Sequence, residues 1–261
     1  MSNIICIANQ KGGVGKTTTA VNLSASLAKN GKKILLIDAD PQSNATTSLG
    51  FSRNDYEFNL YHVLAGVKDF SEITLKTERK GLFLAPSNIG LIGIEKDFHN
   101  TNKKNRELIL KTRLKEIQKD YDFIIIDSPP ALGPITINSL SASDWVIIPI
   151  QCEFFALEGL AQLLNTVSLL SKTINPKLRI KGFLPTMYST QNNLSKQVLD
   201  DLEHHFKDKL FHLQGDDKCI VIPRNVKIAE APSFGQSVID YAENSKGSIA
   251  YQDLATAILK G

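Results

Sequence analysis

The chain of 261 residues contains few cysteines, and none of them is paired by spacing. Cys6, Cys152 and Cys219 form no CxxC motif, and each lies in or beside an apolar segment typical of a strand. A structural zinc site or a disulfide framework would need cysteines at closer, paired spacing. The sequence therefore predicts buried free thiols in a reducing compartment such as the cytoplasm.

Long apolar runs and a strong charge of one sign are also missing. No stretch of about 18 apolar residues occurs, which argues against a membrane-spanning helix. The first expected strand begins at about residue 4, so we expect neither a cleaved signal peptide nor an N-terminal helix-turn-helix. A net charge of +3 is too small to indicate nucleic-acid binding, which needs a local basic patch.

Apolar segments typical of strands alternate with amphipathic segments typical of helices along the chain. This alternation predicts an α/β fold with a single doubly wound, mostly parallel sheet and helices on both faces. A sheet of this size often forms one domain, so we expect one domain over 1–261. The expected strands are 3–8, 33–38, 82–87, 123–127, 145–150, 179–186 and 219–223, and the expected helices include 16–30, 104–119, 158–172, 193–206 and 247–261.

A glycine-rich segment, QKGGVGKTT, stands between the first expected strand and the first expected helix. Gly12, Gly13 and Gly15 let the backbone curl so that its N–H groups point at an anion, at the positive end of the helix dipole. This spacing places Lys16 at the β- and γ-phosphates of a nucleotide and the Thr17 hydroxyl on Mg²⁺. We therefore expect a phosphate site of a P-loop NTPase. Its residues are Lys11, Gly12, Gly13, Val14, Gly15, Lys16, Thr17 and Thr18.

Carboxylates follow two other expected strands, at the edge where open α/β sheets bind their ligands. Asp38 and Asp40 end the strand in LLIDADPQSN, and Asp127 ends the strand in FIIIDSPPALGP. The second arrangement is that of a Walker B carboxylate, which holds Mg²⁺ or its waters. Hydrolysis also needs a group that orients or deprotonates the attacking water, and we assign that role to Asp40. The expected metal ligands are Thr17, Asp40 and Asp127, partly through water.

Four segments resemble the ParA/Soj-type chromosome or plasmid partitioning ATPases of the deviant Walker A (ParA/MinD) family. They are KGGVGKTTTAVNL, LLIDADPQSNATTSLG, FIIIDSPPALG and IPRNVKIAEAPSFG, which together span most of the chain. The resemblance implies ATP and Mg²⁺ as cofactors, hydrolysis that is slow without a partner, and an ATP-dependent homodimer. It also implies that Lys11, beside Gln10 in place of the usual first glycine, crosses the dimer interface to the partner's ATP. Lys11, Lys16 and Asp40 are therefore the expected catalytic residues.

By the same resemblance, the ATP-bound dimer binds double-stranded DNA without sequence preference, and a ParB-like centromere-binding protein stimulates hydrolysis. The implied protein is cytoplasmic and nucleoid-associated, and it drives chromosome or plasmid segregation. Many relatives carry an arginine that contacts DNA where this chain has Gln191. The remaining candidates for DNA contacts are Lys196, Arg224, Lys227 and Lys246, and the resemblance places the adenine against Met187, Pro223 and Asn225.

Two other functions stay open. A MinD-like membrane-associated positioning ATPase binds the membrane surface through a basic amphipathic C-terminal helix. This chain ends in GSIAYQDLATAILKG, with only Lys260 to meet anionic lipid, so we expect a packed helix and no stable membrane association. The second alternative is a nucleotide-gated binding scaffold with little hydrolysis. An iron–sulfur cluster of the nitrogenase iron protein type is not expected, because DSPPALGPITINSL contains no cysteine.

Overall fold

The computed structural model describes residues 2–100, 105–154 and 159–260. These described residues form a seven-stranded sheet in the order β3-β4-β2-β5-β1-β6-β7, in which only β3 runs antiparallel to its neighbour. The strands are β1 (Asn3–Ile7), β2 (Ile34–Asp38), β3 (Leu75–Lys76), β4 (Leu82–Ala85), β5 (Phe123–Asp127), β6 (Trp145–Gln151) and β7 (Arg179–Thr186). The prediction of an α/β fold with a mostly parallel sheet is confirmed.

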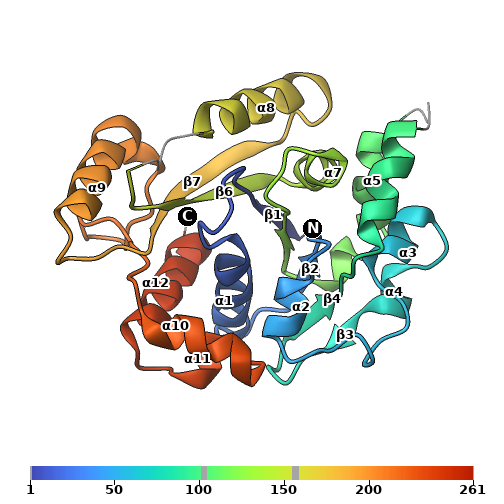
Figure 1. Ribbon diagram of the computed structural model, residues 1–261, viewed down its shortest axis with the longest axis horizontal. Helices are drawn as coiled ribbons and strands as arrows, with labels where there is room; N and C mark the ends of the chain where they lie inside the picture. The colour runs from blue at the N-terminus through green and yellow to red at the C-terminus, as the bar shows by residue number, and fades with distance from the viewer. Residues whose placement is uncertain (1, 101–104, 155–158, 261) are drawn as a thin grey trace.

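Helices cover both faces of the sheet (Figure 1). They are α1 (Lys16–Lys29), α2 (Asn44–Ser48), α3 (Leu60–Ala65), α4 (Phe70–Ile73), α5 (Leu91–Asn100), α6 (Ile109–Leu114), α7 (Pro134–Ala142), α8 (Leu160–Thr173), α9 (Asn193–Phe206), α10 (Val226–Glu230), α11 (Val238–Tyr241) and α12 (Lys246–Lys260). The helices α1 and α12 pack side by side on one face, whereas α5, α7 and α8 lie on the other. Within the described ranges, no helix has the length and apolarity needed to cross a bilayer.

Alternation along each strand decides which side chains reach which face of the sheet. Ile5 and Ile7 of β1 pack in the cluster that contains α1 and α12, whereas Ile4 and Cys6 pack against the helices on the opposite face. Every residue of β2 and of β5 is buried, because helices cover both sides of these central strands. The near-continuous apolar runs in the sequence therefore correspond to the central strands of the sheet.

Several predicted elements are confirmed in place. The helices expected at 16–30 and 193–206 are α1 and α9. Those expected at 158–172 and 247–261 correspond to α8 and α12, with residues 158 and 261 outside the described residues. The apolar side of α12 is buried as expected, because Tyr251, Leu254 and Ile258 pack in the same cluster as α1.

The strand predicted at 219–223 is wrong. Within the described residues, this segment makes isolated bridges, from His212 to Cys219 and from Tyr188 to Pro223. Its Ile222 N–H donates to the Pro185 carbonyl of β7 (2.9 Å), but the segment forms no strand of the sheet. Its two isoleucines, Ile220 and Ile222, are nevertheless buried in the cluster of α1 and α12. The apolar pattern therefore reflects packing beside the end of β7, and a pattern of burial alone does not distinguish this from pairing in a sheet.

The continuous helix predicted over 104–119 is also wrong, because a side chain from α7 interrupts it. The Asn138 Oδ1 accepts a hydrogen bond from the Leu110 N–H (3.2 Å), and its Nδ2 donates to the Arg106 carbonyl (3.0 Å). Those are the two groups that a regular α-helix would join to each other. The segment instead forms 3-10 turns at Arg106–Leu108 and Gln118–Asp120 on either side of α6, while residue 104 lies outside the described residues.

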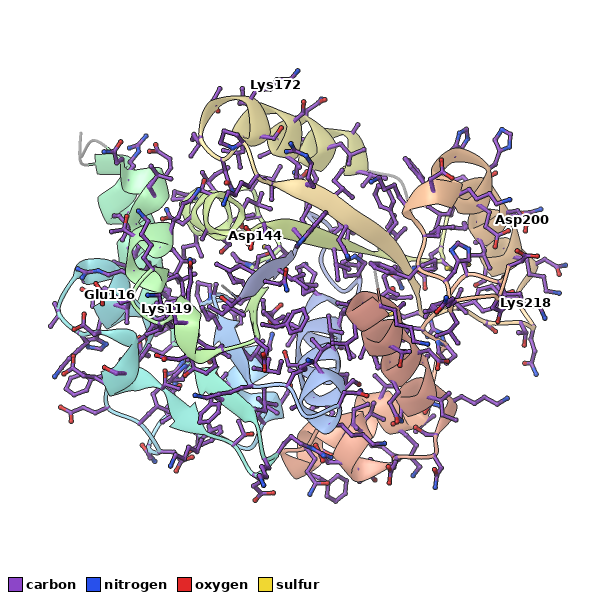
Figure 2. The ribbon with its side chains drawn as sticks, turned by 180° about the vertical axis from the view of Figure 1, so that it is seen from behind. Glu116, Lys119, Asp144, Lys172, Asp200 and Lys218 are labelled. Carbon is purple, nitrogen blue, oxygen red and sulfur yellow. The ribbon has the colours of Figure 1, made fainter. Side chains whose placement is uncertain are left out.

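The amino ends of the strands are tied together by Asp144, which precedes β6 (Figure 2). Its carboxylate accepts a hydrogen bond from the Ile4 N–H (3.0 Å), and its carbonyl accepts one from the Arg179 N–H (3.0 Å). At the opposite edge, the register of β5 with β1 and β2 places Asp127 level with Ile7 and with Asp38. The predicted acidic residues therefore meet at the carboxyl edge of the sheet.

Two glycines form a close contact between segments that are far apart in the sequence. A Cβ added to Gly235, whose φ is +67°, would lie 2.6 Å from the Gly50 Cα and 3.1 Å from the Gly50 nitrogen. Gly50 follows α2, and Gly235 follows the segment after α10. The contact is between main chains, so no side-chain rotation could make room for a larger residue.

Replacing Gly235 with alanine should therefore lower the free energy of unfolding by roughly 2 to 4 kcal/mol, measured by urea denaturation. The matched control is Gly215→Ala, because Gly215 has a similar left-handed φ of +83° but no atom within 4 Å of the added Cβ. That control should lose only the backbone cost of the left-handed conformation, about 1 to 2 kcal/mol. An equal loss in the two variants would contradict the tight contact at Gly50.

Candidate functional site

The glycine-rich loop between β1 and α1 is anchored to two neighbouring strands. The Asn9 Nδ2 donates a hydrogen bond to the Pro149 carbonyl of β6 (2.7 Å), and its Oδ1 accepts one from the Lys11 N–H (3.0 Å). Farther along the loop, the Thr186 hydroxyl at the end of β7 donates to the Val14 carbonyl (2.9 Å). The loop is thus held in shape by β6 and β7 before any ligand binds.

The loop has the backbone geometry that the glycine spacing predicts. Gly13 and Gly15 have positive φ values of 73° and 89°, where a side chain would be strained. Gly15 is also the N-terminal capping residue of α1, and it has no side chain with which to cap this end of the helix. The first N–H groups of α1 therefore remain available to an anion at the positive end of the helix dipole.

Lys16 folds back over this loop and is almost fully buried, with 7% of its surface exposed. Its Nζ donates a hydrogen bond to the Lys11 carbonyl (3.0 Å). Burial lowers the pKa of Lys16, and the nearby Asp127 and Asp40 carboxylates oppose that shift. A buried ammonium group held between carboxylates and a loop of backbone N–H groups is suited to bind phosphate oxygens.

Asp127 is a fully buried carboxylate whose two oxygens have no hydrogen-bond partner among the described residues. Burial raises the pKa of Asp127 well above its ordinary value, and the neighbouring Asp38 adds to the shift. The Thr17 hydroxyl, which lies near this carboxylate but outside ordinary hydrogen-bond geometry, and the Lys16 ammonium oppose the shift. Leaving such a group without a partner costs free energy, which a bound cation or a hydrogen-bond donor would recover.

Asp38 is equally buried but has partners on both carboxylate oxygens. It accepts hydrogen bonds from the Thr46 N–H (2.8 Å), the Thr46 hydroxyl (2.7 Å) and the Asp40 N–H (3.2 Å). Burial raises the pKa of Asp38 to about 6, although these hydrogen bonds lower it. Asp38 therefore holds the local chain in place, whereas Asp40, two residues later, lines the cleft beside the loop.

A cleft of about 300 Å³ lies over the loop. Besides loop residues it is lined by Asp40, Gln42, Asn44, Pro130 and Met187. A second cavity, of about 400 Å³, shares Gly15, Thr18 and Met187 with the first, so the two adjoin. The three residues predicted for the adenine, Met187, Pro223 and Asn225, all line this second cavity.

A larger cavity of about 540 Å³ lies at the opposite, amino edge of the sheet. Asn3, Lys119 and Trp145 are among its lining residues, and none of the predicted site residues lies there. Figure 2, which shows the molecule from behind, labels Lys119 and also Asp144, the residue that precedes β6 at this amino edge. The loop, the carboxylates and the predicted base residues instead share the carboxyl edge, where parallel sheets bind ligands.

Some residues around the loop were not singled out from the sequence. They are Asn9 and Thr186, which anchor the loop, and Gln42, Asn44 and Pro130, which line the cleft. The available signal was position, because each of them lies just before or after the carboxyl end of a predicted strand. Their residue types alone gave no indication of a ligand.

The candidate DNA contacts are all exposed, but two of them already have acidic partners. The Arg224 guanidinium lies 3.1 Å from the Glu153 carboxylate, and the Lys227 Nζ lies 2.9 Å from the Glu230 carboxylate. The bond to Glu230 raises the pKa of Lys227. Lys246 begins α12, which contacts α10, whereas Lys196 lies on α9. The positive charge at these positions is therefore smaller than the sequence indicates.

A parallel sheet with a phosphate-type loop after β1 and carboxylates at the ends of β2 and β5 defines a P-loop nucleotide-binding protein. The AAA domain family model matches residues 2–180. The chain is 47% identical to the sporulation initiation inhibitor protein Soj of Bacillus subtilis over 99% of this chain and 98% of Soj. It is 44% identical to the chromosome partitioning protein ParA of Caulobacter vibrioides, over 98% of this chain and 93% of ParA. The chain therefore belongs to the ParA/Soj family of chromosome partitioning proteins.

A solved structure shares the whole fold. Cobyrinic acid a,c-diamide synthase from Mycobacterium smegmatis, with bound ATP analog and magnesium, superposes with a TM-score of 0.84 and 36% identity. The match covers 100% of this chain and 95% of that protein. The name of that protein describes another reaction than partitioning, so this similarity bears on the fold and the nucleotide site.

Proposed function

We propose that this chain is a partitioning ATPase that binds ATP with Mg²⁺ at the carboxyl edge of its sheet and hydrolyses it. One observation carries the proposal: the glycine loop, the buried Lys16 and the unpartnered Asp127 meet at one place in a member of the ParA/Soj family. The adjoining cavities of about 300 and 400 Å³ are suited to the triphosphate and the base.

The residues at this edge fit a magnesium ion. Asp127 offers two buried oxygens without a hydrogen-bond partner among the described residues, and the Thr17 hydroxyl lies close enough to influence its pKa. Oxygen donors of this kind are the ligands that Mg²⁺ prefers. When bound, the ion would neutralise phosphate charge, held by Thr17 and Asp127, with Asp40 acting partly through water.

Hydrolysis needs the chain to hold the phosphates and to orient a water molecule. The loop N–H groups and Lys16 bind the phosphates, and Asp40 accepts a hydrogen bond from the attacking water at the cleft. The water oxygen forms a bond to the γ-phosphorus, and the bond from that phosphorus to the bridging oxygen breaks, so that ADP leaves with the electron pair. The proton that the water loses passes through Asp40 to the released phosphate or to solvent. Asp40 is held for this role because its Oδ1 accepts from the Gln42 N–H (2.9 Å).

Lys11 has a different place in the loop from Lys16. Its N–H bonds to Asn9 and its carbonyl accepts from Lys16, so its main chain is fixed at both groups. Lys11 is half-buried and next to the exposed Gly12 and Gly13. We assign to its side chain a contact with the nucleotide of a second copy, which makes dimerisation depend on the γ-phosphate.

The two lysines should separate in a mutational test. Lys16→Ala should abolish ATP binding, because this ammonium group is buried at the phosphate site, whereas Lys11→Ala should bind ATP as a monomer and fail to dimerise. Nucleotide affinity by fluorescence and molecular mass by analytical ultracentrifugation with ATP would measure both. Normal dimerisation of Lys11→Ala would refute the contact across the interface.

Replacement of Asp40 with alanine should leave an ATP-bound dimer that hydrolyses at least tenfold more slowly, a change of about 1.4 kcal/mol in the barrier. The reason is that, among the described residues, Asp40 alone brings a carboxylate to the lining of the cleft, whereas Asp38 does not line it and is engaged by Thr46. Phosphate release under single-turnover conditions measures the rate. An unchanged rate would transfer the role to another residue.

We assign to the ATP-bound dimer the binding of double-stranded DNA without sequence preference, and to a ParB-like protein the stimulation of hydrolysis. Together these steps would move a chromosome or a plasmid in a nucleoid-associated cycle. Membership of the ParA/Soj family supports this assignment. The burial of the apolar side of α12 supports it over membrane attachment, which needs that side exposed. Turnover that no partner or DNA increases would favour a nucleotide-gated scaffold instead.

DNA affinity should fall when Lys196 or Lys246 is changed to glutamate. Each lysine that neutralises a phosphate releases close to one counterion, and a glutamate cannot do so. Binding should require ATP, and the charge reversal should flatten its dependence on salt. Lys119→Glu is the matched control, since Lys119 is exposed at the opposite edge of the sheet. Filter binding of a random duplex across a salt series decides, and equal binding with ATP and ADP would reject nucleotide-gated DNA binding.

A further inference from the structure

We infer that Thr46 and Ser87 are positioning residues for hydrolysis, which hold the main chain of Asp40 through a buried chain of hydrogen bonds. The inference rests on the proposed function, because it concerns the residue to which we assign the water. Neither residue lines the described cleft over the loop, and both are almost fully buried, with 1% and 0% of their surfaces exposed. They therefore act through Asp40.

The Thr46 hydroxyl joins α2 to the ends of two strands. It donates a hydrogen bond to the Asp38 carboxylate at the end of β2 (2.7 Å) and accepts one from the Ser87 N–H just after β4 (3.1 Å). The Thr46 N–H adds a second bond to the same carboxylate (2.8 Å). The Thr46 hydroxyl acts both as donor and as acceptor. Together with the bond of the Thr46 N–H, three hydrogen bonds define the place of Thr46 between the two strand ends.

Ser87 completes the link to Asp40. Its hydroxyl donates to the Asp40 carbonyl at 2.6 Å. Ser87 is itself held, because its carbonyl accepts a hydrogen bond from the Tyr56 hydroxyl (2.6 Å). The Asp40 N–H bonds to Asp38, so both main-chain groups of Asp40 are attached to this network. The Asp40 carbonyl also accepts a hydrogen bond from the Ser43 N–H in the turn (2.9 Å), and the Asp40 side chain extends from this held main chain to line the cleft.

The turn after β2 is strained and needs such support. Ser43 has a φ of 54°, a left-handed conformation that is strained for a residue other than glycine. Strain of this kind persists only where surrounding contacts hold the chain. The bonds of Thr46 follow the turn and the bond of Ser87 precedes it, at Asp40. Without them, the turn could relax and carry Asp40 away from the water.

The test compares two variants at sites that touch no nucleotide. Thr46→Val keeps the shape of the side chain but removes the hydroxyl from Asp38 and Ser87, and Ser87→Ala removes only the bond to the Asp40 carbonyl. Each should lower single-turnover ATP hydrolysis at least fivefold, while the affinity for Mg²⁺–ATP changes less than threefold. Thr46→Ser, which keeps the hydroxyl, should recover most of the turnover that Thr46→Val loses.

Thr173→Val is the matched control. Thr173 is the last residue of α8, is exposed, and donates its hydroxyl to the Leu169 carbonyl within the same helix (2.8 Å). The same substitution there should leave hydrolysis unchanged. Thermal melting of every variant gives the highest temperature at which all of them are still folded, and the hydrolysis rates are compared below that temperature. Ser87→Ala, which leaves every bond of Thr46 in place, remains decisive if Thr46→Val does not fold.

The outcomes separate this inference from the proposed function. Slower hydrolysis with retained ATP affinity, recovered in Thr46→Ser, supports positioning. Wild-type rates in the folded variants, or parallel loss of ATP binding and hydrolysis, would overturn it while the ATPase remains established. Absence of hydrolysis by the wild-type chain with ATP, DNA and a ParB-like partner would overturn the proposed function, and this inference with it.

Discussion

The candidate site depends on the position of β5, which lies between β1 and β2 and runs parallel to both. In that register Ile7, Asp38 and Asp127 end at one level, so the loop after β1 meets two carboxylates from distant parts of the sequence. Burial of these carboxylates is costly, because it disfavours their charged form. Asp38 offsets this cost with hydrogen bonds, whereas Asp127 has no partner among the described residues and suits a cation.

The short helix α2 connects the end of β2, which holds Asp40, with the segment before Gly235. In the middle of α2, Thr46 attaches the helix to the carboxylate of Asp38, and beyond its C-terminal end Gly50 touches Gly235. The segment before Gly235 includes Pro232, which lines the cavity next to the loop. A movement of α2 would therefore disturb both the strand end that holds Asp40 and the wall of the proposed base cavity.

The sequence predicted the parts of this molecule in which local pattern and packing agree. The central strands were recognised because burial on both faces demands continuous apolar residues, and the loop because glycine, lysine and threonine must stand at specific spacing. Predictions failed where a distant group intervened. The Asn138 side chain bonds to the Leu110 N–H and the Arg106 carbonyl, and so interrupts a helix that the sequence of that segment favours. Ile220 and Ile222 are buried without forming a strand of the sheet. No periodicity contains that information.

By itself, the sequence determined the α/β class, the loop and the acidic strand ends, because these follow from backbone conformation and residue spacing within short segments. Only the tertiary structure decided that Asp38 is engaged by Thr46 while Asp127 has no partner among the described residues, although both follow apolar strands. It also showed that Arg224 and Lys227 are paired with glutamates. The physical reason is that hydrogen bonding and charge pairing depend on which side chains meet in space, and the parallel register brings together residues that the sequence keeps apart.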